Sequence, residues 1–328
     1  MNSPRNHILD LLKGIAVLLM IQVHVMELFA SDTISKSITG KLSLFLGGAP
    51  VAPLFMIILG YFIAKSNKSV KQLLARSVKI FVLGMALNIA LNLNLIISVY
   101  HGNLAVDILP YVFGVDIFQF AGIALVMIAP LKKIADRHYL LTLMLMLISA
   151  FLGYALLNNV PDNDILKYTS AFLYGSTPWS YFPVFPWLAY PLAGMVIYQL
   201  QQRYDFSWLF AIKTKIIGSI LFLIVIVFTI KYAITISSDL PSYYHHGLLF
   251  FSWTMVFLFF YTLGVNELNK RFRESTVFKY ITWLGKNVTL IYVIQWIIVG
   301  NIGTAIYKTV VSPLYISLSG NRKASLKK

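Results

Sequence analysis

Long apolar runs separated by short polar breaks recur along the whole 328-residue chain. A run of about 20 apolar residues is long enough to cross a bilayer as a helix. Backbone amides in lipid must be bonded within the chain, so only helices or a closed barrel can span it, and these runs lack the alternating pattern of barrel strands. With 58% hydrophobic and only 12% charged residues, the sequence predicts an all-α, polytopic membrane helical bundle.

About ten transmembrane helices are expected, and residues 1–328 show neither a soluble domain nor a clear internal repeat, so they are expected to form a single domain. The first run is too long for a cleavable signal peptide and has no small-residue cleavage pattern, so it is expected to be the first span. The expected spans are 8–30, 45–64, 77–98, 108–130, 139–157, 181–200, 212–234, 246–265, 278–298 and a weaker 300–318.

Lysine and arginine gather in alternate loops, which indicates orientation because cytoplasmic loops carry an excess of both. An even number of spans with both termini cytoplasmic places nearly all of these lysines and arginines on the cytoplasmic side. We therefore expect a multi-pass protein of the cell's inner or plasma membrane, with the lipid bilayer as its immediate partner. The basic positions are Lys65, Lys68, Lys71, Arg76 and Lys79; Lys132, Lys133 and Arg137; Arg203, Lys213 and Lys215; Lys270, Arg271, Arg273 and Lys279; and Arg322, Lys323, Lys327 and Lys328.

These loops account for the net charge of +15, so a nucleic-acid partner is not expected. The chain has no cysteine, which excludes disulfides and cysteine-based metal sites. The neighbouring His245 and His246 are expected at an outer membrane edge, and without carboxylate company they are a poor metal site. No metal is expected.

Three ionisable groups interrupt the first apolar run: Asp10, Lys13 and His24. Lys13 and His24 lie within roughly 20° of one helix face and about 16 Å apart along the axis, and Asp10 lies within roughly 40° of His24. Ionisable groups in hydrocarbon cost free energy, so a functional site is one interpretation. The alternative is that Asp10 and Lys13 form a pair at the membrane surface and that His24 is a packed histidine.

Lys13 and Arg76 both fall at the expected cytoplasmic face. Fixed cations suit the phosphates of an anionic cofactor such as a CoA thioester. The alternative is that they only reflect the orientation rule, which we favour for Lys65, Lys68 and Lys71.

Asp116 and Gln119 lie about one helical turn apart in the fourth expected span. An intramembrane aspartate needs a partner, and His24 or Lys286 could provide it. Glu27, about one turn beyond His24, could tune that histidine or reach water. Three asparagines of the third span are expected as interhelical contacts rather than substrate contacts; they are Asn88, Asn92 and Asn94.

Aromatic residues cluster at the start of the sixth expected span, at Trp179, Tyr181, Trp187 and Tyr190. An aromatic belt at the outer interface explains most of them. The functional alternative is a platform for a sugar, because aromatic faces also stack on pyranose rings.

Residues 10–24, with Asp10, Lys13 and His24, resemble the first helix of the acyltransferase-3 superfamily of membrane acyltransferases. That pattern is Asp-x-x-Arg, an apolar run and then His, and here Lys13 stands for the arginine. Residues 53–63 resemble the second-helix signature of the family and are followed by a basic loop. Residues 283–296 resemble a late helix in which Gln295 stands where many members have His.

Two further stretches, 116–124 and 185–194, are similar to the heparan-α-glucosaminide N-acetyltransferase-like branch. The resemblance implies an acyl-CoA-dependent O- or N-acyltransferase. Its co-substrate would be cytoplasmic acetyl-CoA or another acyl-CoA, and its acceptor a sugar or glycan on or near the outer side.

The resemblance also implies site residues. His24 would be the catalytic base that activates the acceptor, with Asp116 beside it, although an acyl-histidine route stays open. The donor would be bound by Asp10, Lys13, Arg76, Lys286 and Asn287, and the acceptor would contact Gln119, Trp187 and Tyr190. Because lysine lacks the planar fork of arginine, Lys13 would hold the donor as a point charge.

Two other functions fit the same residues. A proton-coupled secondary transporter would use His24 and Asp116 as a relay. An inactive substrate-binding or assembly protein is left open by Lys13 and Gln295, where the chain departs from the family pattern.

Overall fold

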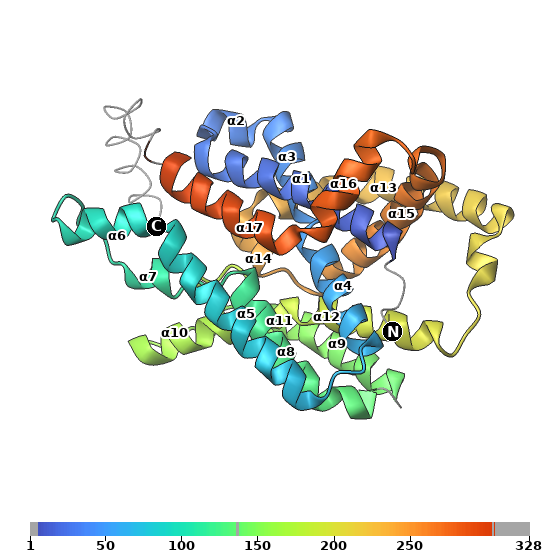
Figure 1. The fold of residues 1–328 in the computed structure, drawn as a ribbon, viewed down its shortest axis with the longest axis horizontal. Coiled ribbons are helices and arrows are strands. Elements are labelled where there is room, and N and C mark those ends of the chain that lie inside the picture. Colours follow the sequence, from blue (N-terminus) through green and yellow to red (C-terminus); the bar gives the residue numbers. More distant parts are fainter. Residues whose placement is uncertain (1–5, 136–137, 304, 306–328) are drawn as a thin grey trace.

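A computed structural model describes residues 6–135, 138–303 and 305, and most of these residues lie in helices (Figure 1). Within them the only strand-like feature is an isolated bridge between Val115 and Ser180. The helices are α1 (His7–Phe29), α2 (Asp32–Lys36), α3 (Ile38–Gly48), α4 (Ala52–Lys65), α5 (Val70–Leu91), α6 (Leu93–Tyr100), α7 (Leu109–Val112), α8 (Ile117–Ala135), α9 (Tyr139–Ala155), α10 (Asp164–Leu173), α11 (Val184–Trp187), α12 (Ala189–Gln201), the 3₁₀ helix η1 (Ser207–Phe210), α13 (Ile212–Ser238), α14 (Leu240–Tyr244), α15 (Leu248–Phe272), α16 (Thr276–Lys286), α17 (Val288–Ile297) and the π-helix η2 (Ile298–Gly303).

Five helical segments of the described chain are long and apolar enough to cross a membrane: α1, the combined α3–α4 segment, α5, α13 and α15. A sixth candidate is α16 with α17, which bend by 80° at the break between them. The all-α, multi-pass class is therefore confirmed. The count of about ten spans and the cytoplasmic termini remain predictions. Most of the tenth expected span, 300–318, and the basic tail lie outside the described residues.

Several expected spans are broken rather than continuous, and two of the breaks lie near the cavity described below. The span expected at 278–298 divides at Asn287, between α16 and α17. The span expected at 181–200 is broken at Phe185, within the short α11, where the residue before Pro186 is extended (φ −104°, ψ 120°). Proline lacks a backbone N–H and disfavours a helical conformation in the residue before it, which explains the second break.

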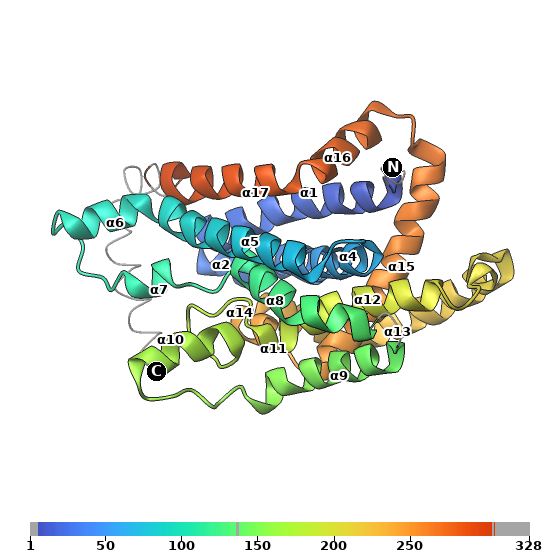
Figure 2. The same cartoon turned by 60° about the horizontal axis from the view of Figure 1, so that its bottom comes forward.

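The helices stack in layers (Figure 2), with α1, α16 and α17 on one side, α4 and α5 in the middle, and α8, α12 and α9 beyond them. Glycines allow the closest crossings. A Cβ added to Gly285 would lie 1.7 Å from the backbone oxygen of Asp10, and one added to Gly14 would lie 1.8 Å from that of Ile281. Small residues at such crossings let helix backbones meet. This contact places the end of α16 against the first turns of α1.

A second glycine crossing joins α4 to α12. A Cβ on Gly60 would lie 1.8 Å from the oxygen of Pro191, and one on Gly194 would lie 1.9 Å from that of Ile57. The helix α4 is therefore held between α12 and the α1 layer, where it forms one wall of the cavity described below.

Polar side chains fix α5 against α8. The Ser77 hydroxyl donates to the backbone oxygen of Gly122 at 2.8 Å. The amide of Asn88 donates to the oxygen of Val112, at the end of α7, at 3.0 Å, and to that of Gly114, in the loop that precedes α8, at 2.8 Å. Asn88 thus makes the interhelical contact expected of it, and it orders the loop that leads to Asp116.

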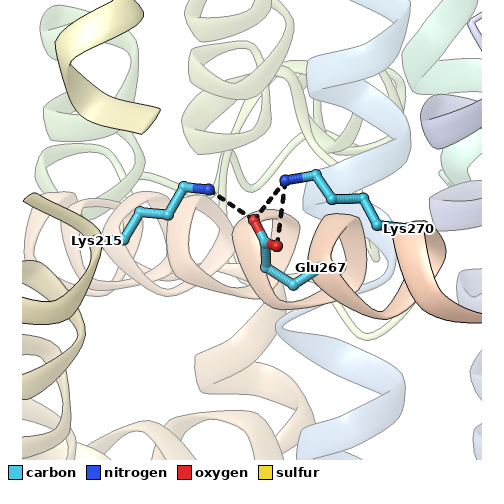
Figure 3. Close-up of polar contacts among 3 residues, drawn as sticks. All are labelled: Lys215, Glu267 and Lys270. Carbon is cyan, nitrogen blue, oxygen red and sulfur yellow. Dashed lines mark hydrogen bonds and ion pairs between the residues drawn. The ribbon is translucent and has the colours of Figure 1, made fainter. Parts of the chain in front are cut away.

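The outer pair α13 and α15 is joined at one end by an ionic cluster (Figure 3). Lys215 and Lys270 both donate to Glu267, at 2.8 and 2.9 Å. Lys215 follows the sixth expected span and Lys270 follows the eighth, so two loops that were both expected in the cytoplasm meet at the same end of the molecule. The cluster shows that the two loops share a side of the molecule, and the cytoplasmic assignment of that side stays a prediction.

Candidate active site

A cavity of about 540 Å³ lies between α1, α4, α5, α8, α14 and the α16–α17 break. Three cations line it, Lys13, Arg76 and Lys286, together with two carboxylates, Glu27 and Asp116. Lys13 and Glu27 are fourteen residues apart on α1, which corresponds to about 21 Å along the axis. The two kinds of charge therefore occupy different ends.

Contacts from other helices assign the remaining charges to these ends. Gly285 packs on the backbone of Asp10, so the next residue, Lys286, lies beside Lys13. On α5, Arg76 precedes Asn88 by twelve residues, or about 18 Å, and Asn88 bonds the loop next to Asp116. We call the region of Lys13, Arg76 and Lys286 the basic end, and the region of His24, Glu27 and Asp116 the acidic end.

Lys13 is held in place at the basic end by an ion pair with Asp10, whose Oδ1 lies 2.7 Å from its Nζ. Asp10 is itself buried and is not part of the cavity wall. Its other oxygen, Oδ2, has no hydrogen-bond partner among the described residues. Asp10 therefore acts on the cavity through Lys13.

The first turn of α17 opens onto the basic end. Val288, Thr289 and Leu290 all line the cavity, and their backbone N–H groups precede the first intrahelical bond, which Ile291 donates to Asn287 at 3.0 Å. The Asn287 side chain makes no capping bond to them, and its amide N–H₂ donates to the backbone oxygen of Trp283 at 2.9 Å. Free N–H groups and the helix dipole make this turn favourable for an anion, next to three cations.

His24 lines the other part of the cavity and is clamped by one face of α17. Its Nδ1 lies 3.2 Å from Oε1 and 2.9 Å from Nε2 of Gln295. The Trp296 ring lies against the imidazole with centroids 4.2 Å apart, and Tyr292 approaches edge-on at 6.4 Å. Nε2 of His24 has no hydrogen-bond partner in the part of the chain that the structure describes. That nitrogen is available to a substrate.

Asp116 bonds to neither of its two expected partners. Its Oδ2 accepts from the Tyr292 hydroxyl at 2.6 Å and its Oδ1 from the backbone N–H of Ile117 at 2.7 Å. The expectation of a direct pair with His24 or Lys286 is wrong for a geometric reason. Asp116 immediately precedes α8 and accepts from the first backbone N–H of that helix, whereas Lys286 lies at the opposite end of the cavity.

The three residues expected to contact the acceptor, Gln119, Trp187 and Tyr190, are fully buried and are not part of the cavity wall. The indole of Trp187 donates to the backbone oxygen of Tyr244 at 2.8 Å. The Tyr190 hydroxyl lies 2.9 Å from Nε2 of His246. These residues support the wall from behind, and a direct contact with an acceptor stays a prediction without support from the geometry.

Three other aromatic residues, Phe182, Tyr243 and Tyr244, line the cavity at the acidic end. The Tyr243 hydroxyl donates to the oxygen of Gly48 at 3.0 Å. Nearby, Ser237 is 1% exposed and its hydroxyl has no partner among the described residues. No pattern pointed to these positions, because they come from short segments around α11 and α14.

His245 and His246 are buried within the protein, 8% and 4% exposed, and their position at an outer membrane edge stays a prediction. Throughout the described ranges, no group of three or more His, Asp or Glu side chains is placed to hold a metal ion.

Comparison with known proteins identifies a family. The model of a family described as "Acyltransferase domain" matches residues 6–320, which include every residue of the cavity wall. No curated protein matches the chain, and no solved structure matches it.

Proposed function

This chain belongs to that acyltransferase family, the acyltransferase-3 superfamily, and from this premise we propose that it moves an acyl group, acetyl in the simplest case, from cytoplasmic acyl-CoA to a sugar or glycan. The family supports membrane acyltransferase activity in general. The observation that carries the finer proposal is a single cavity with cations at one end and an imidazole with a free nitrogen at the other.

The basic end is the proposed site for the phosphates of the donor. Lys13, Arg76 and Lys286 supply fixed positive charge, and the first turn of α17 supplies N–H groups. Lys13 offers a point charge, and its ion pair with Asp10 limits where that charge can go. Between the two ends the wall is apolar, with Phe55, Met56 and Leu59 of α4, which suits the thioester arm of CoA.

His24 is the proposed base. Its Nε2 takes the proton of an acceptor O–H or N–H as the acceptor atom attacks the thioester carbonyl carbon. The carbon–sulfur bond then breaks, and the leaving thiolate takes the proton from the imidazolium. The products are the acylated acceptor and free CoA, and His24 returns to its neutral form.

The acidic end is the proposed acceptor site. Phe182, Tyr243 and Tyr244 offer aromatic faces for a sugar ring, and the Glu27 carboxylate and the unbonded Ser237 hydroxyl can bond its hydroxyl groups. Asp116 lines the same end but bonds Tyr292, so we propose that it positions α17 rather than taking a proton itself.

The test is transfer of label from acyl-CoA in membranes that contain the wild-type protein or His24→Ala. We expect the variant to lose about a hundredfold or more in rate, since a general base contributes on that order, with unchanged abundance and insertion. His101→Ala is the matched control, because His101 is exposed at the end of α6 and is not part of the cavity wall. Retained transfer in His24→Ala would refute the assignment.

A transporter is the alternative of a different class. It needs a relay between His24 and Asp116, and among the described residues Asp116 bonds Tyr292 and Ile117 instead. Acetyl-CoA should raise the thermal stability of the purified protein if the basic end binds donors. A transporter with no donor site would show no such change.

A further inference from the structure

The side chains that hold His24 come from one face of α17. Tyr292, Gln295 and Trp296 stand at positions i, i+3 and i+4 of that helix, which face the same way. Of the three, only Gln295 bonds the imidazole. Gln295 is 6% exposed, and among the described residues its amide has no other side-chain or backbone partner than His24.

The amide of Gln295 can serve either neutral form of His24. Both of its polar atoms lie within hydrogen-bond distance of Nδ1. The Oε1 of Gln295 can accept from a protonated Nδ1 of His24, which leaves the Nε2 of His24 unprotonated and able to act as a base. In the other neutral form, the amide N–H of Gln295 can donate to an unprotonated Nδ1 of His24. In both forms Nδ1 is occupied, so proton exchange with substrate is confined to the Nε2 of His24.

An amide differs from a carboxylate in one respect that matters here. A carboxylate at Nδ1 would favour the imidazolium by its charge, whereas a neutral amide orients the ring without that effect. The titratable groups that share the acidic end are Glu27 of α1, Asp116 before α8, Tyr243 and Tyr244 of α14, and Tyr292 of α17. None of them bonds His24 in the described chain.

We propose that Gln295 is the positioning residue of His24: it fixes the ring with the Nε2 of His24 toward the substrate, and because the amide is uncharged it gives the ring no charged partner that would favour the imidazolium. This inference rests on the proposed function. It adds a residue that is absent from the expected catalytic and binding sets, and it explains how a glutamine can stand at this position of the late helix without loss of the base.

The placement of Gln295 is supported at the far end of its helix. After α17 the chain continues as the π-helix η2, where the Asn301 amide donates to the oxygen of Ala90 at 2.7 Å and its oxygen accepts from the N–H of Asn94 at 3.1 Å. The α17 register is therefore tied to α5 just beyond Gln295.

Two variants test the proposal in the full-length protein. Gln295→Met keeps a side chain of similar length without the hydrogen bond, and we expect kcat to fall at least about tenfold with the KM for acetyl-CoA unchanged. Gln295→Glu adds a carboxylate about 3 Å from Nδ1, and we expect the pH midpoint of kcat to rise by about one unit or more.

A second measurement does not depend on turnover. Diethyl pyrocarbonate modifies neutral imidazole, so the pH dependence of modification of the His24 peptide, followed by mass spectrometry, reports how readily His24 is protonated. The midpoint should rise in Gln295→Glu and stay in place in Gln199→Glu, a control in which the new carboxylate is also buried but lies on α12, away from the cavity wall.

The two readouts separate the failure of this inference from that of the proposed function. If wild type transfers no acyl group but the His24 midpoint still moves in Gln295→Glu, the positioning contact holds and the proposed function falls. The inference is overturned if the midpoint is the same in wild type and Gln295→Glu. It is also overturned if Gln295→Met, folded as judged by its melting temperature, keeps wild-type kcat.

Discussion

Asp116 and Tyr292 form the shortest polar contact at the acidic end of the cavity. Because Tyr292 lies on α17, this contact can act on His24 only by positioning that helix. Asp116→Asn weakens this bond and Tyr292→Phe removes it. If Asp116 acts by positioning α17, the two variants should lower kcat by similar factors, about tenfold, and the double variant should be little worse than either.

The double-mutant cycle distinguishes this arrangement from a direct role of Asp116. An aspartate that acted on His24 itself would make Asp116→Asn much more damaging than Tyr292→Phe, and the two effects would add. The measurement is kcat in the four proteins at saturating acyl-CoA.

At the residue scale, the first helix could be interpreted from spacing alone. Lys13 and His24 share a helix face, and both line the cavity as that spacing suggests. The partner of Asp116 could not be found in the same way, because it depends on where a distant half-helix places Tyr292. The pair of Gln295 with His24 had a visible signal in the i, i+3, i+4 spacing of Tyr292, Gln295 and Trp296, but spacing does not say which helix they face.

At the scale of elements, the crossing of α1 and α16 sets the geometry of the basic end. A Cβ at Gly285 would overlap the backbone of Asp10, so Gly285→Ala must push the helices apart and move Lys286. We expect a loss of about 1–3 kcal/mol in stability, as for other overpacked sites, with weaker stabilisation by acetyl-CoA. Thermal melts with and without acetyl-CoA measure both effects.

Gly264→Ala is the matched control, because Gly264 also lies inside a helix, α15, and an added Cβ would meet nothing within 4 Å. Alanine favours helix more than glycine does, so this variant should be as stable as wild type or slightly more so. Equal melting temperatures for the two variants would mean that the α1–α16 contact is looser than described.

Some straight helices were predicted within a few residues, while breaks inside the expected spans were not predicted. The spans expected at 8–30 and 212–234 correspond to α1 and α13 within a few residues. Hydropathy reports composition but not the direction of the chain, so the expected spans ran through the break at Asn287, between α16 and α17, and through the extended Phe185 of α11. Both breaks border the site: Asn287 lines the cavity, and Trp187 of α11 supports Tyr244 from behind.

At the scale of the whole molecule, the orientation is open to a direct test, because the chain has no native cysteine to give background. We expect Lys68→Cys, in the loop after α4, to be shielded from a membrane-impermeant maleimide in intact cells, and Lys36→Cys, on α2, to be labelled. Both positions are exposed in the structure, so burial would not hide either one. Labelling of Lys68→Cys alone would reverse the predicted orientation.

The half-helix α17 touches both ends of the cavity, with its first turn at the cations and its last turns at the imidazole. The length of this rigid helix therefore fixes the distance between the two ends of the cavity. If the anionic head of a donor rests on the first turn, only a carrier whose reactive carbon lies roughly 10 to 16 Å farther along can reach the base. Acyl donors would then be selected by length as well as by charge. A donor whose acyl arm is shorter by a few bonds would bind but fail to react.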